Sequence, residues 1–204
     1  MKSILKKIVL LLVVLVTIKA EAQSFKAKQV DINIGLGFGS RYRVSSVFGY
    51  RPPISISGEY GITDEISIGV YLGYTGYSLR YTGSDYCNNG NGNGGYYTYE
   101  DTYSWSFYII GLRGAYHFAK FVKDDKMDLY GGLMLGNTFY NYNYSTTSSC
   151  GNHIKTYYST SGPHLAYALF AGGRYHFTDK IGGFGEIGYG ISYLNIGLNI
   201  KIQK

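Results

Sequence analysis

The side chains of this sequence that could do chemistry are four histidines, two cysteines and a few charged residues set among apolar ones. Ser161 and His164 lie three residues apart, and a serine beside a histidine is the pair that nucleophilic hydrolysis requires. Serines are frequent in this part of the chain, however, and no histidine belongs to a G-x-S-x-G nucleophile elbow. The sequence therefore predicts no catalytic residue and no enzyme. The four histidines are His117, His153, His164 and His176.

Metal and cofactor sites are not indicated by the sequence either. Cys150 and His153 offer one thiol and one imidazole, without the paired CxxC spacing of a zinc site. The glycine-rich tract at 88–95 lacks the strand–loop–helix setting in which such a loop binds phosphate. We therefore expect no metal ion and no cofactor.

The first 22 residues have the three parts of a secretory signal peptide. Lysines precede an unbroken apolar run at 8–16, and the run is followed by the small-x-small cleavage signal Ala20-Glu21-Ala22. The alternative, an N-terminal membrane anchor, would need about 20 apolar residues. The sequence thus predicts a signal peptide at 1–22 and a single exported domain at 23–204.

The charge of the chain gives no indication of a nucleic-acid partner. The whole chain has a formal net charge of +6, but removal of residues 1–22 leaves 15 basic and 12 acidic residues, a net charge of +3. The sequence contains no compact basic patch interleaved with aromatic residues. Because charged residues make up only 16% of the chain, the exported domain has few groups with which to cover a soluble surface.

The elements that must position these residues are strands, because apolar and polar residues alternate with period two along 23–204. In the cleanest runs, 30–38 and 194–202, apolar residues alternate with Asn, Gly and single charges. The runs predict an all-β fold, and pairing of the first run with the last would close it into an antiparallel up-and-down barrel. Eight strands are expected, at 30–38, 54–62, 66–74, 104–118, 128–140, 164–177, 181–191 and 194–202.

The two faces of these runs predict a transmembrane barrel rather than a soluble one. One face is regularly Ile and Leu, and tyrosines lie near the run ends, where a membrane barrel has its aromatic girdles. The opposite face holds Gly, Ser and Asn with isolated charges, which suits a narrow polar interior. We expect these charges to pair across a filled lumen; a weakly selective pore is the alternative. The charged residues expected in the interior are Glu59, Arg113, Arg174, Glu186 and Lys201.

Two segments, 80–103 and 141–163, are rich in Gly, Asn, Ser, Thr and Tyr and are expected to be long loops. With both termini in the periplasm, these loops would face outward and the short turns inward. Each loop contains one cysteine, and the two loops flank one predicted hairpin. Because export places the cysteines in an oxidising compartment, we expect Cys87 and Cys150 to form a disulfide; two unpaired thiols are the alternative.

The Gly-interrupted alternating runs and the ending at 188–198, Gly-Tyr-Gly-Ile-Ser-Tyr-Leu-Asn-Ile-Gly-Leu, resemble the outer-membrane β-barrel domain proteins. These are the OmpA/OmpX-like small eight-stranded barrels of Gram-negative, Bacteroidetes-type bacteria. The resemblance covers essentially all of 23–204 and lies in the architecture, not in a short motif. It implies a monomeric protein of the cell outer membrane that contacts outer-membrane lipid and no nucleic acid.

Three functions are compatible with such a barrel. The first is a structural or surface-interaction role, in which the long loops contact an extracellular partner. The second is a narrow porin-like channel, and the third is a lipid-modifying outer-membrane enzyme. The first is favoured, because an eight-stranded barrel is usually filled by its own side chains and because no catalytic motif is present.

Overall fold

The chain folds into eight β-strands in the computed structural model, which describes residues 25–40, 49–88, 94–118, 122, 124, 126–148 and 154–202. The predicted signal peptide at 1–22 lies outside the described residues. No helix in the described part of the chain is long and apolar enough to cross a bilayer. The strands are β1 (Val30–Phe38), β2 (Gly49–Gly61), β3 (Ile66–Asn88), β4 (Gly94–His117), β5 (Met127–Ser148), β6 (Ile154–His176), β7 (Ile181–Tyr189) and β8 (Leu194–Ile202).

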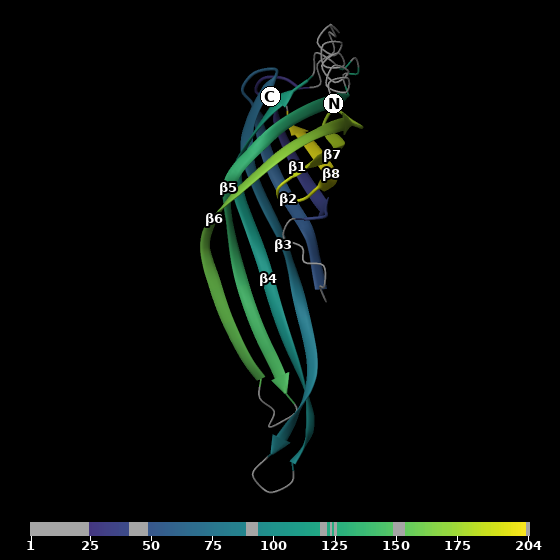
Figure 1. Cartoon of the computed structure of the whole chain (residues 1–204). Helices are drawn as coiled ribbons and strands as arrows, with labels where there is room; N and C mark the ends of the chain where they lie inside the picture. Colours follow the sequence, from purple (N-terminus) through teal and green to yellow (C-terminus); the bar gives the residue numbers. More distant parts are fainter. Residues whose placement is uncertain are drawn as a thin grey trace, which may run out of the picture.

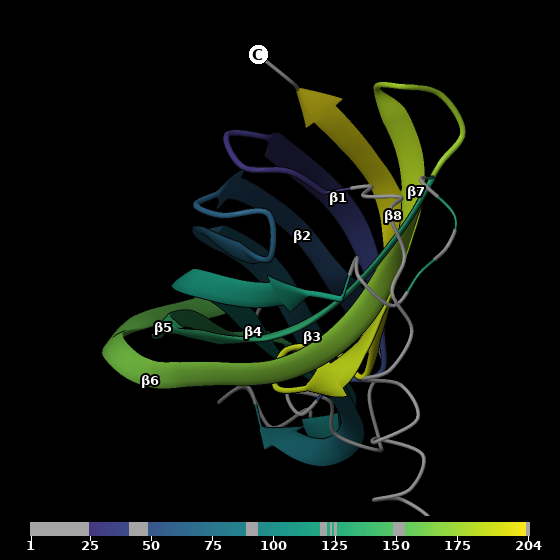
Figure 2. The ribbon, with the colours of Figure 1, turned by 90° about the horizontal axis from the view of Figure 1, so that it is seen from above.

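The sheet is a closed up-and-down barrel, as the alternation predicted. Each strand pairs with its neighbour in sequence, and β1 also pairs with β8 (Figure 2). This last pairing runs over both whole strands, from Val30 opposite Ile202 to Phe38 opposite Leu194. Closure removes the free sheet edges that a hydrocarbon environment does not tolerate.

The barrel wall is apolar outside and polar inside. Ile68, Val70 and Leu112 face outward and are 54%, 55% and 70% exposed. Asp31 and Arg174 face inward and are 0% and 1% exposed. Because strand side chains alternate between the faces, one regular pattern produces both surfaces. Aromatic residues border the outer apolar belt at both ends: Tyr60, Tyr116, Tyr175 and Phe177 near the short turns, and Tyr74, Tyr108, Tyr167 and Tyr189 at the other end.

The short turns at 62–65 and 177–180 share a Thr-Asp sequence and fold in the same way. Oγ1 of Thr63 accepts a hydrogen bond from the backbone N of Ile66 at 3.0 Å. Oγ1 of Thr178 accepts the same bond from the N of Ile181, also at 3.0 Å. A threonine hydroxyl that satisfies a backbone donor is a common local device for a tight turn.

The expectation of long loops at 80–103 and 141–163 is wrong, because most of both segments is strand. β3 and β4 pair without a register shift out to Asn88 opposite Gly94, and β5 and β6 pair out to Thr147 opposite Ile154. β3 to β6 each contain 22 to 24 residues, whereas the other four strands contain 9 to 13. The four long strands therefore extend well beyond the short ones as a curved sheet (Figure 1). We call the part formed by 75–88, 94–107, 140–148 and 154–163 the projecting sheet.

The projecting sheet is strand because Tyr and Thr, which favour extended backbone, fill its positions. Cross-strand rings also contact one another; Tyr86 and Tyr96, for example, have centroids 5.8 Å apart. The apolar–polar alternation that marks the barrel wall ends here, so these segments resemble loops in sequence. Their strand structure follows instead from pairing between long neighbours.

Candidate functional site

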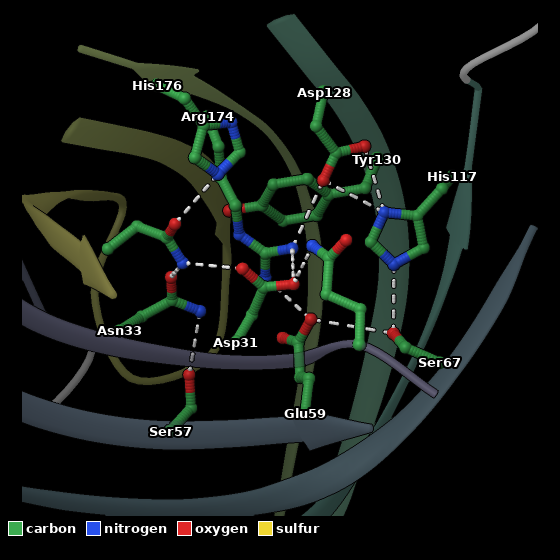
Figure 3. A network of polar contacts seen from close by, with 12 residues as sticks. Asp31, Asn33, Ser57, Glu59, Ser67, His117, Asp128, Tyr130, Arg174 and His176 are labelled. Carbon is green, nitrogen blue, oxygen red and sulfur yellow. Dashed lines mark hydrogen bonds and ion pairs between the residues drawn. The ribbon is translucent and has the colours of Figure 1, made fainter. Parts of the chain in front are cut away.

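The interior of the barrel near the short turns contains a cluster of charged side chains around Arg174 (Figure 3). Arg174 donates from Nη2 to Oε2 of Glu59 at 2.6 Å and from Nη1 to Oδ2 of Asp128 at 3.1 Å. Oδ2 of Asp31 lies 3.9 Å from Nη1. These four side chains come from β6, β2, β5 and β1, so the cluster links strands on opposite sides of the barrel.

Arg113, on β4, is the centre of a second group of contacts. Its Nε lies 2.7 Å from Oε1 of Glu59, and its Nη2 lies 2.7 Å from Oε1 of Glu186. Tyr130 donates its hydroxyl to the same Glu186 oxygen at 2.9 Å, and the Arg113 guanidinium lies 4.0 Å from the centroid of Phe170. Glu59 thus bridges the two arginines. Buried charges persist only with such partners.

Four of the five charges expected in the interior, Glu59, Arg113, Arg174 and Glu186, lie in this charged cluster. Lys201 lies one residue before the end of β8 and is half-exposed. Sequence reasoning did not single out Asp31 or Asp128, which are as deeply buried as the others. The signal for them was their position on the polar face of alternating runs.

Ser67, His117 and Asp128 form a hydrogen-bonded series on β3, β4 and β5. Nδ1 of His117 lies 2.9 Å from Oδ1 of Asp128, and Nε2 lies 3.0 Å from Oγ of Ser67, the order found in a Ser-His-Asp triad. Ser67 is 0% exposed, however, and Phe25 stacks on the His117 ring with centroids 3.5 Å apart. Asp128 is also held by Arg174. A substrate has no access to Ser67 in this structure, so the series fits a packing role better than hydrolysis.

Residues 25–29 close the lumen at the short-turn end. Lys28 has a left-handed φ of 66°; its N donates to the carbonyl of Gly61 at 2.8 Å, and Gly61 N donates to the carbonyl of Gln29 at 2.9 Å. A Cβ at Gly61 would lie 2.5 Å from the Lys26 carbonyl oxygen and 3.0 Å from the Phe25 ring, which requires glycine there. The segment that follows the predicted cleavage site therefore covers the charged cluster.

Apolar side chains fill the lumen beyond the charged cluster, toward the projecting sheet. A cavity of about 40 Å³ adjoins both layers, with Arg113 and Glu186 among its lining residues. This is room for a few water molecules, at roughly 10–15 Å³ each. The lumen is thus occupied at two successive levels. The buried apolar group consists of Tyr71, Ile109, Met134, Ala166 and Ile191.

The other residues considered for chemistry lie elsewhere. Oγ of Ser161 is 2.9 Å from Nε2 of His164 on the exposed part of β6, where the His164 ring stacks on Tyr140. Cys87 belongs to β3, whereas Cys150 and His153 lie outside the described residues, so the disulfide stays a prediction. Among the residues that the structure describes, no group of three or more His, Cys, Asp and Glu could hold a metal ion.

The inner face of the projecting sheet carries a row of aromatic rings that sequence reasoning missed. Tyr77 stacks on Trp105 with centroids 4.9 Å apart, and Trp105 lies 5.2 Å from Tyr142. Farther along the sheet, Tyr103 lies 4.9 Å from Tyr144. All five rings are half-buried. Their period-two spacing on neighbouring strands was the available signal, and three of them, Tyr103, Tyr142 and Tyr144, lie in segments that were expected to be loops.

No family model and no curated protein matches this chain. Among solved structures, it is similar to a de novo designed transmembrane β-barrel (TM-score 0.46, 12% identity, 87% of this chain and 98% of that chain). It is also similar to the N-terminal β-barrel domain of OprF from Pseudomonas aeruginosa (0.44, 13%, 86% and 98%). A third is Ail, the attachment invasion locus protein of Yersinia pestis, in complex with the heparin analogue sucrose octasulfate (0.36, 10%, 85% and 92%). Similarity below a TM-score of 0.5 carries over neither function nor partner.

The geometry of the chain itself defines the class of fold. A closed ring of eight antiparallel strands, an outward belt of exposed Ile, Leu and Val, and an inward cluster of paired charges together make a transmembrane β-barrel.

Proposed function

We propose that this protein is an outer-membrane β-barrel with a filled lumen, and that it presents the projecting sheet at the cell surface as an interaction surface. The proposal rests on a change in the composition of the two sheet faces along β3 to β6. Around the barrel the outer face is apolar, whereas beyond the Tyr74–Tyr108 pair it carries groups such as Ser78 and Ser104, whose Oγ atoms lie 2.9 Å apart. Most of the aromatic residues now lie on the inner face, among them Tyr77, Tyr103 and Trp105. A sheet with a polar outer face belongs in water, beyond the membrane.

The filled lumen favours a surface role over a channel. A solute would have to pass the Arg174–Glu59 ion pair, the stacked Phe25 and the apolar layer around Met134. Each of these is buried and held by contacts with several strands. Purified protein in a planar bilayer should therefore show no regular conductance steps.

Site-directed labelling tests the proposed orientation. In a Cys87→Ser/Cys150→Ser background, we expect Gly95→Cys to react with a membrane-impermeant maleimide on intact cells. Gly95 is exposed and a Cβ there meets nothing within 4 Å, so the substitution is tolerated. Asp179→Cys, in the exposed turn between β6 and β7, is the matched control and should react only after the outer membrane is permeabilised. Equal labelling of the two on intact cells, or the reverse order, would overturn the proposal.

A further inference from the structure

Asp101 lies among three tyrosines on the inner face of the projecting sheet. Tyr144 donates its hydroxyl to Oδ1 of Asp101 at 3.1 Å, and Tyr81 is the cross-strand partner of Asp101. The centroid of Tyr103 is 4.9 Å from that of Tyr144 and 5.8 Å from that of Tyr81, whose plane is turned by 80°. We call these four side chains the Asp101 cage: one carboxylate walled by rings from three neighbouring strands.

The cage faces the same side of the sheet as the lumen. Asp101 and Tyr103 have the same parity as Arg113 on β4, and the pairing of β4 with both of its neighbours is free of register shifts between them. Because strand side chains alternate between the two faces, the odd-numbered side chains of β4 from Asp101 to Arg113 all lie on the inner face. Tyr81 is 57% exposed, so the cage is open to solvent.

Among the side chains that the structure describes, which do not include that of Lys155 on β6, no cation is paired with Asp101. None of the ion pairs formed by the described side chains includes Asp101. The hydrogen bond that its carboxylate accepts comes from the neutral phenol of Tyr144. Glu100 differs, because it points to the other face and pairs with Arg80 at 3.2 Å. Burial, and then the negative charge of Asp101, raise the pKa of Tyr103 above its ordinary value. The cage is thus a half-buried site of negative potential.

A carboxylate beside aromatic rings selects organic cations. Ring faces attract ammonium and guanidinium groups, and the carboxylate adds a charge-assisted hydrogen bond. Guanidinium fits best, since it is planar, stacks on rings and can bind a carboxylate with two donors. Nucleic acid and other polyanions are repelled by Asp101, and aromatic stacking without a basic groove does not hold them.

The rings continue from the cage toward the barrel along two strands. Trp105 and Phe107 follow Tyr103 on β4, and Tyr142 and Tyr140 lie beside them on β5. From Asp101 to Phe107 the strand rises by roughly 20 Å at about 3.4 Å per residue. The row of rings is therefore longer than a small cation and matches the length of an extended peptide of several residues. Surfaces rich in Tyr, Ser and Asn are also those with which binding proteins contact other proteins.

We infer that the Asp101 cage binds an arginine side chain of an extended peptide segment in a partner protein, with the neighbouring peptide side chains lying on the Trp105–Tyr142 rings. The inference rests on the proposed function, in which the projecting sheet is exposed at the cell surface.

Calorimetry on the full mature protein in detergent micelles tests the inference. The probe is a nine-residue peptide with one central arginine and a leucine two residues to either side; the same peptide with citrulline, a neutral isostere, is the control ligand. We expect the arginine peptide to bind at least about tenfold more tightly than the citrulline peptide. Asp101→Asn should remove that difference, whereas Glu100→Gln, the neighbouring carboxylate on the opposite face, should retain it.

Each other outcome has a defined meaning. Equal affinity for the two peptides, or equal affinity of Asp101→Asn and wild type for the arginine peptide, overturns the inference. If acetyl-arginine amide alone binds as tightly as the peptide, the occupant is a small free cation and the peptide partner is wrong. A heat-dependent gel shift of each variant shows that the barrel is folded. Labelling of Gly95→Cys on intact cells is independent of these results, so failure of the cage leaves the proposed function standing.

Discussion

Replacement of Arg174 by alanine should lower the free energy of unfolding by about 3–5 kcal/mol, which is the cost of leaving buried charges without their partner. Arg174 is 1% exposed and contacts Glu59 and Asp128, so its removal leaves two carboxylates short of a counter-charge inside the lumen. The measurement is the urea dependence of the folded band on unboiled gels, with protein refolded in detergent or lipid vesicles. The single tryptophan, Trp105, lies in the projecting sheet and reports less directly on the lumen.

The control for this prediction is an ion pair of the same chemistry outside the lumen. Arg80 pairs with Glu100 at 3.2 Å, with side chains that are 35% and 40% exposed. Arg80→Ala should change the free energy of unfolding by only about 0–1 kcal/mol, because exposed pairs gain little over water. Equal effects of the two substitutions would show that Arg174 does not stabilise the barrel through ion pairs across the lumen.

Leu112→Arg should lower the free energy of unfolding from a bilayer by about 2–4 kcal/mol, the cost of a cation on the lipid face near the membrane centre. Leu112 is 70% exposed and lies midway between Tyr108 and Tyr116 on β4. From Tyr108 to Tyr116 the strand contains nine residues, about the number that a tilted strand needs to cross the apolar core of a membrane. The measurement is reversible folding into lipid vesicles.

The same substitution separates a membrane barrel from a soluble one. In a soluble protein, an exposed leucine replaced by arginine changes stability by less than about 0.5 kcal/mol. Thr98→Arg is the internal control, since Thr98 is exposed and has the same strand parity as Leu112, within the projecting sheet. If Leu112→Arg and Thr98→Arg are equally mild, the apolar belt does not face lipid.

The barrel wall was predictable from sequence because period-two alternation there has a physical cause. At 30–38 and 194–202 one face meets an apolar exterior and the other a polar lumen. The type of each residue therefore indicates which face it lies on. At 80–88 and 94–103 that contrast ends, and Tyr, Thr and Gly remain. Composition alone then resembles a loop, whereas pairing of β3 with β4 maintains the strands.

The charged cluster was predictable in part for a related reason. Parity places Glu59 and Arg174 on the polar face, but their contact joins β2 to β6 across the ring. Which arginine meets which carboxylate depends on strand register and tilt, and a single sequence does not contain either. The stacking of Phe25 on His117 was outside the reach of pattern reasoning, because it depends on a turn with Lys28 at positive φ.

The most direct test of the central claim is cell fractionation followed by gel electrophoresis of the same sample with and without boiling. A closed, eight-stranded membrane barrel is expected in the outer-membrane fraction and should migrate differently when boiling unfolds it. Recovery as a soluble periplasmic protein, with identical migration of the boiled and unboiled samples, would contradict the account.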